Sequence, residues 1–254
     1  SVSWMSRWYG FLQTRPASAR KVAPFIAAYG IDASEFASSS FASFNDFFIR
    51  KLKKERRPIA QGEDVAALPA DGRYLVFPDL QQTSGFYVKG QQFDLPAFLQ
   101  DSAVARRIEG SDMIIARLCP TDYHRFHFPC KGVPCSAREI NGPLFSVNPI
   151  ALRKKLGILA ENKRMITEIE TERFGTILYV EVGATFVGSI HQTYTPNIQV
   201  EKGEEKGYFS FGGSCLVLLF EARRIVFDAD LIANSENGFE TRALFGGSFG
   251  RALL

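Results

Sequence analysis

Three short motifs contain the residue types that an acyl transfer needs. Asp71 lies in PADGR, His124 and His127 lie in DYHRFHFP, and Ser214 ends the first of two copies of FGGS. A histidine can take the proton of a serine hydroxyl, and a carboxylate can hold that histidine in orientation. The residue types alone are a weak signal, because Asp-Gly is typical of a turn and the chain has no G-x-S-x-G motif. The histidines also suit structural hydrogen bonding.

The two FGGS copies differ in their surroundings. The first follows the turn-forming segment EKGEEKG and leads into the apolar run at 215–220. A turn that feeds a buried strand can hold a strained peptide bond, and Gly213 has no side chain to shield its carbonyl from the Ser214 hydroxyl. The second copy ends at Ser248, near the end of the sequence, where chains tend to fray. We therefore expect chemistry at the first copy and none at the second.

Histidine and cysteine usage does not indicate a metal site. The chain has three histidines and four cysteines, without a C-x-x-C pair. His124 and His127 are three residues apart, but no third ligand is evident nearby. We expect no bound metal, and we interpret the cysteines as reduced thiols of a cytoplasmic protein.

The composition is that of a globular protein with a sizeable core. Of 254 residues, 46% are hydrophobic and 22% are charged. The net charge of +3 is too small to indicate a nucleic-acid partner. No signal peptide is visible, and no apolar stretch approaches eighteen residues, so we expect nothing that spans a bilayer.

Most of the chain has the pattern of antiparallel sheets. Short apolar runs alternate with Gly and Pro from Tyr74 onward, and long helical patterns between them are missing. The segment NPIALRKKLGILAENKR suits a helix or a long loop, and residues 228–248 suit a polar helical tail. The predicted strands are RYLVF, DMIIARL, GTILYVEV, ATFVGSI, SCLVLLF and RRIVF. The sequence predicts an α+β fold with a mainly antiparallel catalytic domain at 61–254.

Residues 1–60 form a different, aromatic and basic region. SARKVAPFIAAYGI predicts a helix that stops at Gly30, and SFNDFFIRKL predicts a second, with Ser43 or Asn45 as its N-cap. The run RKLKKERRP follows, with its basic residues at 50–57 just before Pro58. Aromatic helices beside basic residues suit an anionic membrane surface. The alternative is a helical subdomain that packs on the core and exposes a solvated basic face.

Six motifs together identify a family. FNDFFIRKLK…RPI, PADGR, DYHRFHFP, FSVNPIAL, VEVGATFVGSI and KGEEKGYFSFGGS…VLLFE occur in one order. From about Trp4 to the C-terminus the chain resembles the phosphatidylserine decarboxylase proenzymes. The resemblance implies self-cleavage between Gly213 and Ser214 into paired chains 1–213 and 214–254. It further implies that Ser214 becomes a pyruvoyl group, so that no external cofactor is required.

The resemblance also assigns roles to the candidate residues. It implies that Asp71 and His127 activate Ser214 for cleavage and that His124 serves the decarboxylation. The implied reaction converts phosphatidylserine to phosphatidylethanolamine, and we expect a peripheral protein on the cytoplasmic face of the cell membrane. A homodimer is compatible with the sequence, which does not give the oligomeric state. Cys215 departs from the Thr or Ser usual in the family, and we expect it to be a small strand residue.

Three other functions remain open from the sequence. A pyruvoyl decarboxylase of a soluble amino acid would share the motifs, although the aromatic and basic N-terminal region favours a lipid. A non-catalytic lipid-binding relative would not need Asp71, His124, His127 and Ser214 intact. A conventional serine hydrolase would explain the residue types but none of the other motifs.

Overall fold

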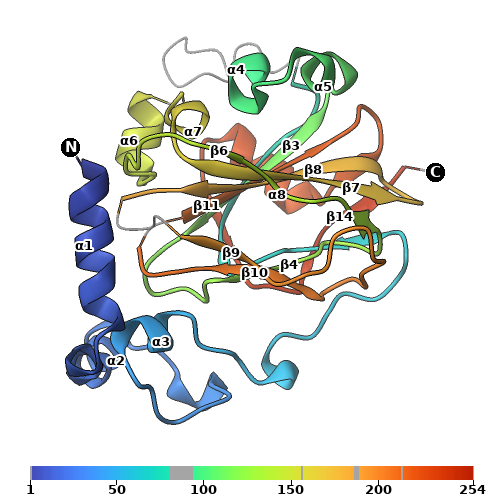
Figure 1. The fold of residues 1–254 in the computed structure, drawn as a ribbon. Helices are drawn as coiled ribbons and strands as arrows, with labels where there is room; N and C mark the ends of the chain where they lie inside the picture. The colour runs from blue at the N-terminus through green and yellow to red at the C-terminus, as the bar shows by residue number, and fades with distance from the viewer. Residues whose placement is uncertain (1, 81–93, 156, 186–188, 213, 254) are drawn as a thin grey trace.

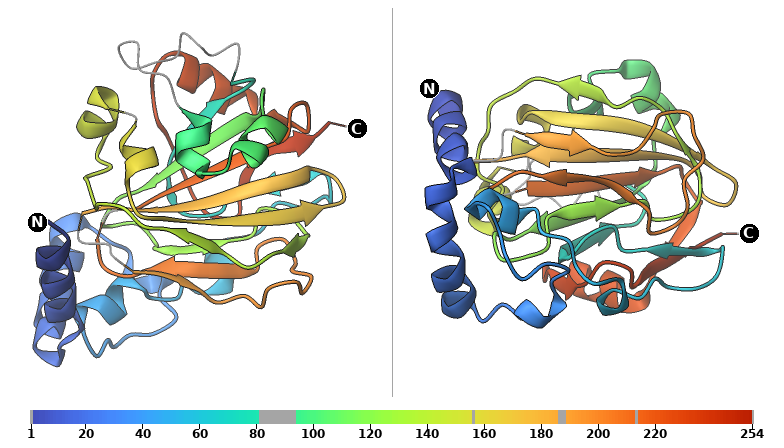
Figure 2. Two further views of the ribbon diagram at one scale, coloured as in Figure 1. Left: turned by 45° about the horizontal axis from the view of Figure 1, so that its top comes forward. Right: turned by 60° about the horizontal axis from the view of Figure 1, so that its bottom comes forward.

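A computed structural model describes residues 2–80, 94–155, 157–185, 189–212 and 214–253. Its described part is an α+β fold in which every paired strand is antiparallel, so the predicted fold class is confirmed. A large central sheet has helices α4 to α7 over one face and smaller sheets against the other (Figure 1). The N-terminal helices lie together at one edge, in Figure 1 and in both views of Figure 2.

The central sheet contains eight strands among the described residues. Seven follow the order β13-β2-β3-β11-β8-β7-β5, and β6 also pairs with β7. Their bounds are β2 Gly72–Phe77, β3 Asp112–Leu118, β5 Val133–Pro134, β6 Arg138–Ile140, β7 Arg164–Thr171, β8 Gly175–Gly183, β11 Ser214–Phe220 and β13 Thr241–Ala243.

Two three-stranded sheets face this central sheet. One has the order β1-β14-β12 and the other the order β4-β10-β9. Their bounds are β1 Val65–Ala67, β14 Ser248–Ala252, β12 Ile225–Phe227, β4 Arg125–His127, β10 Glu205–Phe209 and β9 Ile190–Gln192.

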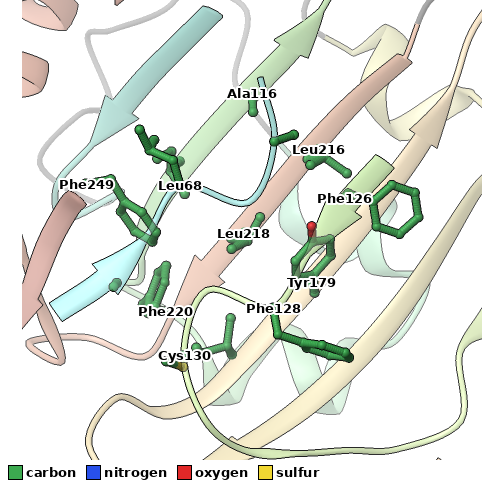
Figure 3. Close-up of a cluster of buried hydrophobic side chains, with 14 of the residues drawn as sticks. Leu68, Ala116, Phe126, Phe128, Cys130, Tyr179, Leu216, Leu218, Phe220 and Phe249 are labelled. Atoms are coloured by element: carbon green, nitrogen blue, oxygen red, sulfur yellow. The ribbon is translucent and has the colours of Figure 1, made fainter. Parts of the chain in front are cut away.

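The middle strand β11 is buried on both faces, which explains its continuous apolar sequence. Leu216, Leu218 and Phe220 point into the core between the sheets, which Figure 3 shows together with Phe126 and Tyr179. Residues 215, 217 and 219 alternate with them and face the helices. Those helices are α4 Leu95–Leu99, α5 Ser102–Arg107, α6 Pro149–Lys154 and α7 Ile158–Glu161.

The N-terminal region contains both predicted helices, although the second ends at Phe48, before the end of its predicted segment. Gly30 ends α2 (Val22–Tyr29) in the left-handed conformation, and the Ser43 side chain caps α3 (Phe44–Phe48) by accepting from the amide of Asp46. A core of Phe36, Phe44 and Phe47 joins these elements. Helix α1 (Val2–Thr14) and the 3₁₀ turns η1 Pro16–Lys21, η2 Ala33–Glu35 and η3 Lys54–Arg56 complete the region.

Two predictions of secondary structure are wrong. The C-terminal region is not a helical, frayed tail: after α8 (Ala229–Glu236) it forms β13 at the sheet edge and β14 in the middle of a sheet, and Phe249 is fully buried. The sequence ATFVGSI is not one strand, because 184–185 lie outside β8 and β9 begins at Ile190. Its residues 186–188 lie outside the described part.

Candidate active site

Ser214 is the first residue of the middle strand β11, whose starting end lies toward the N-terminal helices (Figure 1). It pairs with Leu118 on β3 and with Gly183 on β8, and it is fully buried. Alternation along β11 gives Ser214 the same face as Leu216, toward the smaller sheets. Within the described residues its Oγ has no hydrogen-bond partner. Gly213, the other side of the predicted cleavage site, lies outside the described residues.

His124 has one ring nitrogen occupied and one open. Its Nδ1 lies 2.9 Å from the carbonyl oxygen of Asp122, so Nδ1 carries the proton and Nε2 is left as a proton acceptor. No described group forms a hydrogen bond with Nε2 in this fully buried ring. Burial, opposed by the backbone of Asp122 and reinforced by the charge of Arg50, lowers the pKa of His124 to about 3. The ring is therefore neutral at physiological pH.

His124 lies close to the first FGGS copy. Its carbonyl accepts from the amide of Phe209, and its ring packs on Phe48 with 3.9 Å between centroids. Phe48 in turn contacts Phe211. The backbone of Gly212, two residues before Ser214, is near enough to the ring to favour its protonated form. A neutral base thus lies beside the segment that contains the predicted cleavage site.

His127 has both ring nitrogens occupied. Nδ1 lies 3.0 Å from the carbonyl oxygen of Gly203, and Nε2 lies 3.3 Å from the hydroxyl of Tyr123. The ring stacks on Phe245 with 3.7 Å between centroids. Burial lowers the pKa of His127 to about 3, with a smaller contribution from the charge of Arg125. This histidine is also a neutral proton acceptor, but its acceptor nitrogen is held by a tyrosine.

Asp71 is buried and anchored by an arginine. Arg57 donates from Nε and Nη2 to the carboxylate, at 2.9 Å to Oδ1 and 2.6 Å to Oδ2. The amide of Phe245 donates to Oδ1 at 2.8 Å. Asp71 makes no hydrogen bond with His127 here; its link to that ring runs through Phe245 and through Pro69, whose carbonyl accepts from the amide of His127.

The structure places the two histidines in separate aromatic environments. The ring of His124 contacts Phe48, whereas that of His127 contacts Tyr123 and Phe245. The strand register is irregular here, because Glu205 pairs with His127 while Gly207 pairs with Phe126. The extra residue is Lys206, which belongs to β10, the strand that pairs with the histidine strand β4. In the described part of the chain, no three His, Cys, Asp or Glu side chains are grouped to hold a metal ion.

Comparison with known proteins supplies the identity of this arrangement. Residues 44–250 match the model of the phosphatidylserine decarboxylase family. The chain belongs to this family. It is 50% identical over 251 residues to the phosphatidylserine decarboxylase proenzyme of Chlamydia trachomatis (serovar L2, strain 434/Bu), covering 98% of this chain and 83% of that protein. The corresponding proenzyme of Chlamydia muridarum is 51% identical with the same coverage, and that of Chlamydia pneumoniae is 49% identical over 97% of this chain and 83% of its own length. The resemblance predicted from the motifs is confirmed.

The sequence analysis of this decarboxylase family member does not identify two residues that support the site. Each lies in a segment whose pattern indicates a different role. Arg57, inside the basic run, bridges Asp71 and Glu35 and has a side chain only 7% exposed. Phe245 belongs to the second FGGS copy, yet it covers His127 and holds Asp71. The ordered second copy therefore supports the site, although we expect no reaction there.

The basic run at 50–57 is only partly a surface feature, which corrects its prediction as one docking cluster. Arg50 is buried, donates to the carbonyls of Thr121 and Asp122, and lies over the ring of Phe47. Lys51, Lys53, Lys54 and Arg56 are exposed. The two arginines at the ends of the run thus fasten the N-terminal region to the site.

Cys215 lies on the opposite face of β11 from Ser214. Its side chain is fully buried in the core beneath the helices. Burial raises the pKa of its thiol to about 12. This environment agrees with the prediction of a small packing residue.

Proposed function

We propose that this chain is a phosphatidylserine decarboxylase that matures by cutting itself between Gly213 and Ser214. The single observation that supports this most strongly is the Ser214 hydroxyl, which is buried without a described partner at the start of β11. An unsatisfied buried hydroxyl is costly, so its retention favours a chemical role over a packing role. The chain also belongs to a family whose relatives are named proenzymes, which supports the proposed self-cleavage.

Cleavage would proceed by attack within one peptide unit. Oγ of Ser214 attacks the carbonyl carbon of Gly213 while a histidine takes its proton, and the returned proton lets the Ser214 nitrogen leave, so the amide becomes an ester. Loss of the Ser214 α-proton then breaks the Cβ–Oγ bond and releases the Gly213 carboxylate. The dehydroalanine left at position 214 hydrolyses to a pyruvoyl group and ammonia.

We assign the base of this step to His127, as the family resemblance implies. Its neutral ring has the required lone pair at Nε2, held only by a 3.3 Å contact with the Tyr123 hydroxyl. Exchanging that contact for Oγ of Ser214 would activate the serine. Asp71 would act through Phe245, because Arg57 and the Phe245 amide occupy its oxygens while the Phe245 ring orients the imidazole.

The surroundings of residue 214 fit a pyruvoyl group. Such a group supplies an electrophilic carbonyl that accepts the electrons left when carbon dioxide departs. The open Nε2 of His124 is a buried proton acceptor near that position. It could take a proton from the ammonium group of the substrate and return it to the carbon that loses carbon dioxide.

Mass spectrometry and a carbon dioxide assay on the purified protein test this function. We expect a fragment that begins with a pyruvoyl group at position 214, and carbon dioxide release from phosphatidylserine that hydroxylamine blocks by trapping the carbonyl. Release from free amino acids with none from the phospholipid would instead support the soluble-substrate decarboxylase. An intact chain without activity would contradict the proposal.

We also propose that the N-terminal helices bind an anionic membrane surface on the cytoplasmic face. None of the eight residues of α2 is buried although the helix has no charged side chain, and Trp8, Phe11 and Tyr29 are more than half exposed. Among the helices that the structure describes, none is long and apolar enough to cross a bilayer. An apolar surface beside exposed lysines suits docking at the lipid headgroups.

Neutralising the exposed lysines of the run should weaken this binding. We expect Lys51→Gln/Lys53→Gln/Lys54→Gln to lose about 1 kcal/mol of binding free energy for each charge removed, measured by sedimentation with anionic vesicles. The matched control Lys131→Gln/Arg173→Gln/Arg251→Gln removes three exposed charges from the sheet domain and should bind normally. Equal binding to neutral and anionic vesicles at every salt concentration would exclude the electrostatic contribution.

A further inference from the structure

A buried ion pair lies between the two sheets, apart from the candidate catalytic groups. Nζ of Lys206 on β10 lies 2.5 Å from Oε1 of Glu181 on β8, and both side chains have zero exposure. Lys206 also donates to Oγ1 of Thr167 at 2.9 Å and to Oε1 of Gln192 at 2.8 Å. Oε2 of Glu181 accepts from Nε2 of Gln192 at 3.1 Å. Every donor of the ammonium group therefore has an acceptor.

Aromatic rings surround this ammonium group and connect it to a candidate base. Nζ of Lys206 lies 4.8 Å from the ring centroid of Tyr179, 4.9 Å from that of Tyr194 and 5.8 Å from that of Phe126. The rings of Phe126 and Tyr179 project into the space between the sheets (Figure 3). The Tyr179 hydroxyl donates to the carbonyl of His127 at 3.3 Å. Through Tyr179, the ion pair is thus connected to the backbone of β4, the strand that carries His127.

Lys206 is the extra residue of the β10 bulge. Its neighbours Glu205 and Gly207 pair with His127 and Phe126, so one additional residue is accommodated on β10. A Cβ at Gly207 would collide with the carbonyl oxygen of His191 and the ring of Phe126, so only glycine permits this close approach. A bulge redirects a strand locally, and here the Lys206 side chain attaches it to the facing sheet.

The other end of the ion pair is tied to the Ser214 strand. Glu181 pairs with Leu216 on β11, and Gly183, two residues further along β8, pairs with Ser214. The ion pair therefore spans from the strand beside Ser214 to the strand beside His127. It therefore joins the two facing sheets next to these strands.

We propose that Lys206 and Glu181 are positioning residues for self-cleavage. They hold the Ser214 strand β11 and the histidine strand β4 in a fixed position relative to each other. The inference rests on the proposed function. Buried ion pairs add little net stability, because an apolar pair of similar volume is often equally stable. The benefit of this pair is the single alignment that its hydrogen bonds permit.

The double variant Lys206→Met/Glu181→Met separates positioning from stability. It removes both charges while keeping two long side chains in the space. We expect newly synthesised chain to cut itself on the order of 10- to 100-fold more slowly on denaturing gels, because small misplacements of reacting groups have large effects on rate. The melting temperature, compared in a Ser214→Ala background, should stay near that of the parent. The control Arg173→Gln/Glu63→Gln removes an exposed ion pair and should cut at the parental rate.

Cleavage at the parental rate in the double variant, with unchanged stability, would overturn the inference. If the double variant does not fold, Thr167→Val decides, because it removes one acceptor of Lys206 with little change of shape. Slower cleavage at a parental melting temperature is then the supporting result, and a parental rate is the contradicting one. A parent chain that never cuts itself would instead contradict the proposed function.

Discussion

The Ser214→Ala variant is expected to remain a single uncut chain without decarboxylase activity. Removal of Oγ leaves no nucleophile to attack the Gly213 carbonyl and no atom from which the new ester could form. The substitution deletes a buried hydroxyl that has no described partner, so the fold should be retained. Denaturing gels and a carbon dioxide assay on the folded variant measure both losses.

The second FGGS copy provides the matched control. Ser248→Ala changes the same residue type in the same tetrapeptide, but Ser248 is exposed at the start of β14. We expect this variant to yield two fragments and to keep its activity. Two fragments from Ser214→Ala, or an uncut Ser248→Ala, would refute the assignment of cleavage to the first copy.

The sequence predicts the elements whose burial follows a simple pattern. The predicted strand SCLVLLF at 214–220 matches β11 in full, because a middle strand that packs on both faces has a continuous apolar sequence. Gly30 and Ser43 mark the ends of the two short helices because left-handed backbone and side-chain capping each require particular residue types. Local chemistry is sufficient in these cases.

Residues that act through distant partners could not be identified this way. Lys206 lies in EKGEEKG, which resembles a solvated turn, and its burial depends on Glu181 in another sheet. Arg57 ends a run of surface charges, and its role depends on Asp71, fourteen residues away. Phe245 is predicted to lie in a frayed tail because no nearby residue indicates that β14 pairs on both sides. In all three cases the burial and contacts of the side chain depend on residues that are far away in the sequence.

The final prediction concerns the separate roles of the two histidines. His127→Ala should stay uncut, because without a base the Ser214 hydroxyl is a poor nucleophile. His124→Ala should be cut and then decarboxylate about 100- to 10,000-fold more slowly, the usual effect of losing a general acid or base. Gels report the cutting, and carbon dioxide release reports the second step.

The geometry of the two rings also allows the opposite assignment, in which His124 is the base for cleavage. Both rings are neutral, and both hold their proton at Nδ1 against a backbone carbonyl. Nε2 of His124 has no described hydrogen-bond partner, in a ring that lies near the backbone of Gly212, whereas Nε2 of His127 must first release the Tyr123 hydroxyl. An uncut His124→Ala beside a normally cut His127→Ala would therefore transfer the cleavage step to His124, while Ser214 would remain the nucleophile. Normal cutting in both single variants would show that neither histidine is required as the base.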